Sequence, residues 1–441
     1  MRQSLKNYLP FLFILLSFKA HSQQNTRSPY SLFGVGLRQY NGFADNSAVG
    51  NNGASYRYES NFSFSNPASL SALKFSAFNI GGYMDMGTVK TSLLSQNFSN
   101  AGLGYLALGV PLKKIKGGLA FGIQPYSDVG YNIYNVKDSS GVSISNEFEG
   151  RGGLSRLNIG LGSMIGKYIS LGFNYSFIFG QMDESSRRRY PGSIAKISYA
   201  ENRSTYLNGH HLDLGMQFHL ATDSGFSQIL GIVLSNKTKL KGDLERIGYT
   251  FNEPFLGNET LKDIIFSDTV SKKLILPQSL TINYSIGKNE KWQITAGYSK
   301  TMWQNYQSIF GDNGGFSNDQ GYSLGAFYCA KAFDKRIKNE KFLRYVKSIR
   351  YSVGYFHQDG YIRVNGNPIA ENGITFGFGF PFTKTHKNYD GSQKLITSRI
   401  FVTGEFVRRG TTSFSLIQEN FFRIKLGLNL ADSWFNKRLF N

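Results

Sequence analysis

Cysteine, acidic residues and long apolar runs are scarce in this sequence, and each shortage excludes a class of structure. Cys329 is the only cysteine, which excludes an intramolecular disulfide and a metal site built on several cysteines. No run after the first twenty or so residues approaches eighteen apolar positions, so no transmembrane helix is expected there. Acidic residues number 29 against 49 basic ones, a formal net charge of +20, so any charged partner is expected to be anionic.

Residues 1–22 have the three parts of a secretory signal peptide. Arg2 and Lys6 form a basic start, and 8–18 is an apolar core too short to span a membrane. Small residues stand at Ala20 and Ser22, the two positions that a signal peptidase reads. We therefore expect residues 1–22 to be cleaved and the remainder to be exported.

The stretch 421–430 sets the pattern for the rest of the chain. Its apolar side chains alternate with polar or small ones: Phe422, Ile424, Leu426, Leu428 and Leu430 against Arg423, Lys425, Gly427 and Asn429. Side chains alternate across a strand, so this segment has one apolar face and one wet face. About ten residues is also the length that a tilted strand needs to cross a bilayer.

Similar segments recur along the chain, and we expect about 14 strands in all. They are 74–84, 102–110, 117–128, 154–164, 168–179, 206–220, 227–238, 278–286, 291–300, 321–330, 348–358, 372–382, 397–408 and 421–430. An even number of strands with one apolar face predicts an all-β fold, a closed antiparallel transmembrane β-barrel over residues 74–441. A soluble β-sandwich also alternates, but the strand length and the aromatic share of 15% favour the barrel.

The connections between these strands alternate between long and short. We expect the long ones to lie on the outer side of the membrane, as in bacterial barrels: 85–101, 129–153, 180–205, 239–277, 301–320, 359–371 and 409–420. Two connections on the opposite side, 331–347 and 383–396, are longer than expected and basic.

Residues 23–73 lack clean alternation and are rich in glycine and aromatic residues. They end in Asn66-Pro67-Ala68, a sequence that favours a turn just before the first strand. Exposed aromatic surface would be costly in the periplasm, so we expect 23–73 to fill the barrel as an N-terminal hatch, or plug. An extended N-terminal tail is the alternative.

These features together resemble the FadL-type family of outer-membrane long-chain fatty-acid transporters, in a divergent branch. In that family a hatch ending in Asn-Pro-Ala plugs a 14-stranded barrel, and Asn66-Pro67-Ala68 stands at that place. Leu276-Pro277 is similar to the family's Leu-Pro start of a mid-barrel strand, and 303–306 to its aromatic step. The resemblance implies an outer-membrane location and an apolar pocket with a basic residue for a carboxylate.

The candidates for ligand contact are aromatic residues of the hatch and basic residues of inward parity near the closing strands. They are Phe33, Phe43, Phe62, Phe64, Arg350, Arg399, Arg423 and Lys425. An Arg or Lys facing lipid at mid-membrane costs about 2–4 kcal/mol, so the basic residues are expected to line the lumen or the rim. There they could hold a carboxylate, or pair with acids of the hatch such as Asp45 and Glu59.

No catalytic or metal-binding set is expected. His211, Asp213 and His219 share inward parity on strand 206–220, but the two imidazoles would lie roughly 27 Å apart at the usual strand rise. They cannot share a metal ion, and solvated lumen residues are the favoured interpretation. No cofactor is implied, and the protein is not expected to be an enzyme.

Two functions follow as hypotheses. The first is a passive outer-membrane channel for hydrophobic small molecules such as long-chain fatty acids, gated by the hatch, with capture among 239–277 and 301–320. The alternative is a barrel that does not transport and instead anchors an outer-membrane secretion or assembly complex, which the basic connections 331–347 and 383–396 favour. Expected partners are membrane lipid and lipopolysaccharide phosphates, with Arg187-Arg188-Arg189 as one contact, and nucleic acid is not expected.

Overall fold

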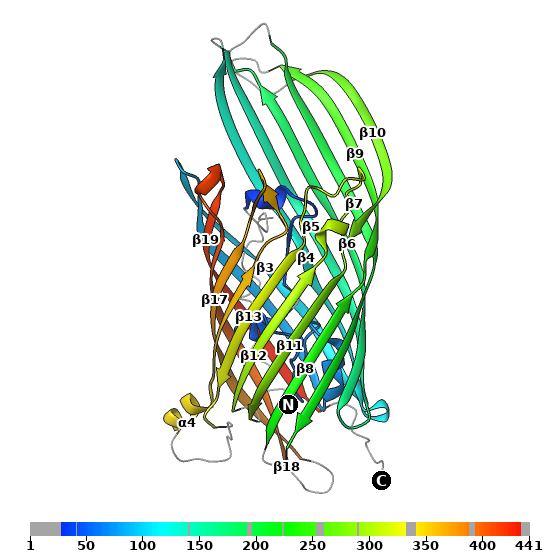
Figure 1. Ribbon diagram of the computed structural model, residues 1–441, viewed down its shortest axis with the longest axis vertical. Coiled ribbons are helices and arrows are strands. Elements are labelled where there is room, and N and C mark those ends of the chain that lie inside the picture. Colours follow the sequence, from blue (N-terminus) through cyan, green and yellow to red (C-terminus); the bar gives the residue numbers. More distant parts are fainter. Residues whose placement is uncertain are drawn as a thin grey trace, which may run out of the picture.

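A closed ring of antiparallel strands surrounds an inner segment in this computed structural model (Figure 1). The structure describes residues 28–40, 42–139, 142–191, 196–222, 225–252, 260–288, 291–331, 341–387 and 393–433. The expected signal peptide, residues 1–22, lies outside these ranges. We call residues 28–73, which lie within the ring, the inner segment.

The ring is built from long strands in chain order. They are β2 (Ser76–Lys90), β3 (Ser95–Leu112), β4 (Gly117–Ser139), β5 (Val142–Ile165), β6 (Ile169–Arg189), β7 (Ser198–Ala221), β8 (Phe226–Ser235), β9 (Thr238–Asn252), β10 (Thr260–Leu276), β11 (Ser279–Lys288), β12 (Trp292–Thr301), β13 (Asp319–Tyr328), β14 (Arg350–Gln358), β17 (Glu371–Lys387), β18 (Gln393–Gly410) and β19 (Gln418–Asp432). Last and first strands pair from Gln418↔Lys90 to Asp432↔Ser76, which closes the barrel.

The barrel has 14 staves. The sheet counts 17 strands, of which β1 (Leu37–Arg38) belongs to the inner segment. β8 and β9 both pair with β7 and form one interrupted stave, and β10 and β11 form the next one. The expected fold class is therefore confirmed, and each of the segments expected as strands lies on a different stave.

Shorter elements occupy the interior and the rims. The inner segment contains η1 (Pro29–Leu32), β1, α3 (Ala44–Ser47) and η2 (Pro67–Ala72). The connections contain η3 (Lys113–Ile115), η4 (Trp303–Asn305), α4 (Lys341–Ser348), the hairpin β15 (Arg363–Val364) and β16 (Asn367–Pro368), and η5 (Ser413–Ser415). None of the helices in the described ranges is long and apolar enough to cross a membrane.

The expectation of loops at 129–153, 180–205 and 239–277 is wrong. These residues extend β4 to β7 and form β9 and β10, which rise above the other strands on one side of the barrel (Figure 1). We call this extension the wall: 124–139, 142–156, 178–189, 198–209, 238–252 and 260–276. Its strands were missed because no lipid contacts the outer face above the membrane, so the strict alternation of apolar and polar residues disappears from the sequence.

Below the wall, the outer face of the barrel is apolar and the inner face is polar. Exposed side chains on the outer face include Phe121, Phe173, Tyr175, Leu214, Leu324, Ile374, Phe406 and Leu426. Buried polar side chains on the inner face include Asn158, Asn174, Gln217, Asn283, Thr375, Thr403 and Asn429. An apolar exterior around a polar interior is the pattern of a barrel that sits in a bilayer.

A charged residue placed on this outer face is expected to destabilise the barrel only at membrane depth. Leu426→Arg should lower the free energy of unfolding by about 2–4 kcal/mol, measured by urea titration in lipid vesicles. Tyr134→Arg, an exposed site in the wall, is the matched control and should change it little. Equal losses at both sites would contradict the assignment of the lipid-facing belt.

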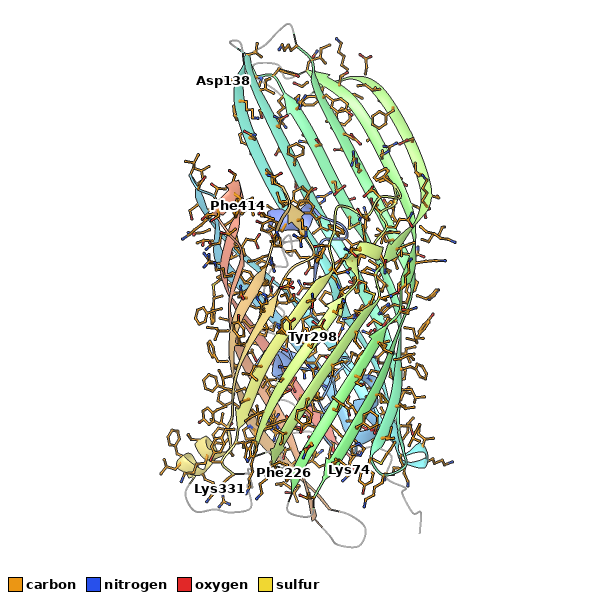
Figure 2. The ribbon with its side chains drawn as sticks, viewed as in Figure 1. Lys74, Asp138, Phe226, Tyr298, Lys331 and Phe414 are labelled. Atoms are coloured by element: carbon orange, nitrogen blue, oxygen red, sulfur yellow. The ribbon has the colours of Figure 1, made fainter. Side chains whose placement is uncertain are left out.

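The two ends of the barrel differ. The end opposite the wall carries the short turns between β3 and β4 and between β5 and β6, together with α4 (Figures 1 and 2). Short turns face the periplasm in bacterial barrels, so we call this the periplasmic end.

Candidate functional site in the filled lumen

The inner segment is hydrogen-bonded to strands on every side of the lumen. Asn174 on β6 donates to Phe64 O at 2.8 Å, and Asn283 on β11 accepts from Ala54 N at 2.7 Å. On the opposite side, Thr403 of β18 donates to Ala44 O at 2.8 Å. Further bonds come from Gln217, Ser323, Thr375, Lys425 and Asn429. These lumen-facing polar side chains of the barrel strands thus find hydrogen-bond partners on the inner segment's backbone and side chains.

Glycines let the backbone of the inner segment lie directly on the barrel strands. A Cβ at Gly325 would stand 2.2 Å from Val49 O, and one at Gly354 would stand 2.2 Å from Gly50 N. The same close approach of backbone occurs at Gly162, Gly172 and Gly231. Real Cβ atoms are not found at such distances, so these positions require glycine while the inner segment is in place.

The Asn-Pro-Ala sequence fixes the end of the inner segment. Asn66 caps η2 by accepting from Ala68 N at 3.0 Å, and its amide donates to Ala54 O at 2.8 Å and Met216 O at 3.2 Å. Pro67 occupies the first helical position, where its missing N–H costs nothing. The motif therefore caps η2 and links the end of the inner segment to the backbone of β7.

Three of the aromatic candidates for ligand contact form a filled cluster. Phe43, Phe62 and Phe64 are at most 3% exposed and pack edge-to-face with one another. Phe43 also stacks on Tyr105 of β3, with ring centroids 4.1 Å apart. Phe33 lies apart from this cluster and packs against a second one described below. Leu70, Leu73 and Ala107 belong to the same buried cluster and pack between these rings and the barrel strands.

Two of the basic candidates belong to a buried ion network beside the closing seam. Arg423 on β19 donates to both carboxylate oxygens of Asp85 on β2, at 2.6 and 2.8 Å. Lys425 lies 2.8 Å from Glu405 Oε1 and donates to Ser47 of the inner segment at 2.7 Å. Both acids are nearly inaccessible, so the cations neutralise charge that would otherwise be buried alone.

A second network lies nearer the wall end. Arg409 on β18 bridges Glu371 at 2.6 Å and Glu419 at 2.8 Å, and Ser28 of the inner segment donates to Glu419. In the first network, Asp85 and Arg423 share inward parity on the two strands that meet when the barrel closes, but parity alone does not identify them as partners. Nothing in the sequence indicated that Ser28 reaches the second one.

The two remaining basic candidates lie nearer the periplasmic end. Arg350 of β14 is buried between two rings, its guanidinium carbon 4.7 Å from the centroid of Tyr58 and 4.3 Å from that of Phe327. Cation–π contact of this kind holds the inner segment's Tyr58 against the barrel. Arg399 on β18 is also buried. The structure thus brings Arg423 and Lys425 together and leaves Arg350 and Arg399 outside that network.

Above the inner segment, extracellular connections close the lumen with an apolar cluster that we call the cap. Trp303, Tyr306, Phe316 and Tyr361 pack together, with Trp303 and Tyr361 stacked at 3.8 Å. They rest on the inner face of the wall, where Leu154, Ile178, Leu207, Leu240 and Leu274 are buried. Burial raises the pKa of the Tyr361 hydroxyl, which stays neutral and donates to Gly36 O of the inner segment. Trp303, the first residue of the aromatic step at 303–306, is buried in the cap.

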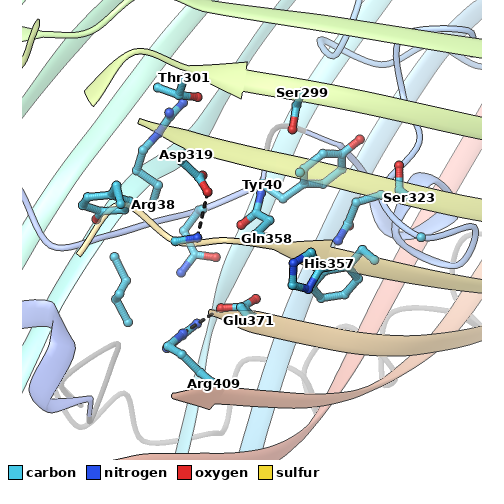
Figure 3. A pocket seen from close by; sticks show the side chains of 18 of the residues that line it. Arg38, Tyr40, Ser299, Thr301, Asp319, Ser323, His357, Gln358, Glu371 and Arg409 are labelled. Carbon is cyan, nitrogen blue, oxygen red and sulfur yellow. Dashed lines mark hydrogen bonds and ion pairs between the residues drawn. The ribbon is translucent and has the colours of Figure 1, made fainter. Parts of the chain in front are cut away.

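The cavity between the cap and the inner segment is small and mainly polar. It has a volume of about 300 Å³. Charged and hydroxyl side chains of the barrel strands line it together with apolar side chains such as Trp303, Ile362 and Phe421 (Figure 3). Asp319 accepts from Gly360 N at 2.9 Å, and Arg409 donates to Glu371 at 2.6 Å in the lining of the cavity. Such a lining suits water or a small polar solute rather than an acyl chain.

β3 and β4 separate part-way along the barrel, and the inner segment pairs with the freed edge of β4. β3 and β4 pair only from Leu106↔Ile123 to Leu112↔Gly117, and above this the two strands diverge. β1 pairs with the freed edge of β4 through Leu37↔Asp128 and Arg38↔Ser127. A Cβ at Gly36 would stand 2.4 Å from Asp128 O, so this pairing is close-fitting.

The histidine and carboxylate candidates on β7 form no metal site. His211 lies 3.0 Å from Asp213 and 2.6 Å from Thr238, whereas His219 lies at the periplasmic end. No group of three histidine, cysteine or carboxylate residues suited to a metal occurs in the described ranges. The run Arg187–Arg189 ends β6 near the top of the wall, where Arg189 pairs with Glu147.

Comparison with known proteins places the fold. The solved structure of the CymD monoaromatic hydrocarbon channel matches with a TM-score of 0.54 at 13% identity, covering 92% of this chain and 100% of that one. The toluene transporter TodX of Pseudomonas putida matches with a TM-score of 0.55 at 15% identity, covering 90% and 99%. A FadL homologue of Pseudomonas aeruginosa matches with a TM-score of 0.52 at 11% identity, covering 90% and 98%. At these identities the likeness shows a shared fold, so the expected resemblance to FadL-type barrels is confirmed at that level.

Sequence comparison supplies the family. No curated protein matches the chain, but the BamG family model matches residues 4–441, nearly its whole length. A closed barrel with an apolar belt of this kind resides in the outer membrane. The chain is therefore an outer-membrane β-barrel that belongs to the BamG family.

Proposed function

We propose that this barrel is a structural subunit of an outer-membrane protein assembly and that its inner segment is a permanent plug. The observation that carries the proposal is the filled lumen: the inner segment is bonded to strands all round, and the cap closes the space above it. Opening a path would break many buried hydrogen bonds, each of which costs about 1–3 kcal/mol when a partner is left unsatisfied.

The wall supports the same proposal. It carries six strands beyond the membrane surface, far more sheet than is needed to close the barrel. Ion pairs join neighbouring side chains of the wall, as in Arg246–Asp268 at 2.5 Å and Arg151–Asp183 at 3.6 Å. A large and ordered extracellular surface suits stable contact with another protein.

Purification of the protein from its own outer membrane in mild detergent tests the assembly. We expect a stoichiometric complex that survives gel filtration, because a subunit of an assembly is retained by its partners. Recovery of the barrel alone, at wild-type levels and under several mild detergents, would overturn the proposal.

A disulfide between the inner segment and the barrel distinguishes a permanent plug from a moving hatch. After Cys329→Ser, the pair Ala48→Cys and Gly377→Cys places the two Cβ atoms about 2.5 Å apart, so a shift of roughly 1 Å gives disulfide geometry. We expect the oxidised and reduced proteins to form the complex equally well. Complex formation that is lost on oxidation and restored by reduction would show that the inner segment must move. Both single-cysteine variants should keep forming the complex under oxidation.

A channel for hydrophobic small molecules is the second candidate function. Two observations favour it: the shared fold with the CymD hydrocarbon channel and the TodX toluene transporter, and the separation of β3 from β4 beside β1. In this case β1 would be the moving part, and long-chain fatty acids would be one class of cargo. Uptake of a labelled fatty acid or toluene into barrel-containing vesicles, increased by Gly36→Ala, would support the channel over the structural subunit.

A further inference from the structure

A second cavity opens beneath the inner segment at the periplasmic end of the barrel. Its volume is about 910 Å³, which is ample for a stretch of several residues of polypeptide. The ceiling is formed by residues 57–59 and 71–75 of the inner segment, and the sides by the lower ends of β3, β5, β7, β8, β11 and β12. Neither of the functions considered above uses this cavity.

The cavity is strongly basic. Its titratable lining consists of Arg57, Glu59, Lys74, Lys113, Lys116, His219, Lys288 and Tyr58. The one carboxylate among them, Glu59, is paired with Lys74. The wall at the other end carries charges of both signs, several of them in ion pairs, whereas the lining of this cavity has an excess of basic groups. This is the opposite end from the lipopolysaccharide phosphates that the sequence suggested as its partners.

Part of this basic lining is held in place by the fold. The Arg57 guanidinium donates to Ser71 at 2.8 Å, Gln217 at 3.2 Å and Ser170 at 3.3 Å, which fixes it in the cavity ceiling. His219 Nδ1 is buried without a hydrogen-bond partner on the cavity side wall. Rings of Tyr58, Phe75, Trp292 and Phe327 lie between the basic groups. Arg57 is thus a cation fixed beside aromatic surface, an arrangement that suits recognition of an anionic group.

We propose that this cavity binds an acidic polypeptide segment, interspersed with aromatic or apolar residues, of a periplasmic partner protein. The inference rests on the proposed assembly function and gives that partner a chemistry. A membrane phospholipid is disfavoured because the strands around the cavity are paired and separate it from the bilayer. A single phosphate is disfavoured because the basic groups are spread over a much larger volume.

The test uses the full chain in detergent and a fluorescein-labelled acidic peptide in which phenylalanine interrupts glutamate. We expect saturable binding that weakens with salt and weakens about tenfold in Lys113→Glu/Lys288→Glu, because two cations become anions at the cavity. The matched control is Lys114→Glu/Lys291→Glu, which reverses charge on the same two turns at residues that do not line the cavity. Folding of both variants is checked by heat-modifiable migration on gels.

Three results would overturn the inference: no binding by the wild type, equal weakening in both double variants, or displacement of the peptide by a soluble peptidoglycan fragment at lower concentration than by unlabelled peptide. The outcome is separable from that of the proposed function. A complex that survives purification with Lys113→Glu/Lys288→Glu would leave the assembly function standing and remove this cavity as its docking site. If the wild type forms no complex, the assembly function fails while peptide binding is judged separately.

Discussion

Arg423→Ala is expected to lower the free energy of unfolding by about 3–5 kcal/mol, the usual cost of removing one partner from a buried ion pair. The change would leave Asp85 without its bidentate partner and leave only Lys425 for Glu405, in a region where both acids are at most 5% exposed. It would also weaken the seam between β19 and β2 where the barrel closes.

A double-mutant cycle separates this charge effect from lost packing. Asp85→Ala alone should also be costly, whereas Arg423→Ala combined with Asp85→Ala should cost less than the sum, because neither charge is then left unpaired. Lys74→Ala breaks an exposed pair with Glu59 and should cost less than about 1 kcal/mol. Urea unfolding in micelles, followed by tryptophan fluorescence, gives all four values. Additive losses in the cycle would contradict a coupled pair.

Replacing the glycines beneath the inner segment with alanine is expected to lower the free energy of unfolding, whereas the same change in a strand usually raises it. In a strand, alanine normally gains about 0.5–1 kcal/mol over glycine. At Gly325 and Gly354 the added methyl group would meet the backbone of Val49 and Gly50 at 2.2 Å, and overpacking of this kind costs about 1–3 kcal/mol per site. Gly325→Ala/Gly354→Ala should therefore unfold at lower urea concentration and expose the inner segment.

Limited trypsin digestion measures that exposure directly, because Arg57 lies within the inner segment. Cleavage there should become faster in the double variant while the barrel strands stay resistant. Gly82→Ala is the control, since its nearest neighbour would be Gly102 O at 3.1 Å and no atom of the inner segment lies close to it. Unchanged cleavage and stability in Gly325→Ala/Gly354→Ala would mean that the inner segment does not rest on these strands.

The sequence could predict the part of the fold that lipid enforces. In 421–430, hydrocarbon on one side and a polar lumen on the other require strict alternation, and the structure has β19 there with Leu426 outward and Asn429 inward. The same constraint located a segment on each of the staves. It does not act above the membrane, which is why 239–277 was taken for a loop although it holds β9 and β10.

The interior was harder to predict because its contacts join residues far apart in the chain. Inward parity identified Arg423 and Lys425 as lumen residues, but it could not decide between a bound carboxylate and Asp85 or Glu405 as their partners. Similarly, the sequence of 23–73 does not show whether an aromatic side chain lines a ligand cavity or packs inside a filled cluster. Phe43, Phe62 and Phe64 do the latter, and only the three-dimensional arrangement with Tyr105 reveals it.

The wall stands on one side of the barrel only, so the molecule is asymmetric about the membrane normal. A barrel of equal height all round could contact neighbouring proteins from any direction. This barrel presents the wall on one side and shorter strands on the other. Proteins gathered around it would take up a fixed angular order, and those on the low side would keep free access to the extracellular space.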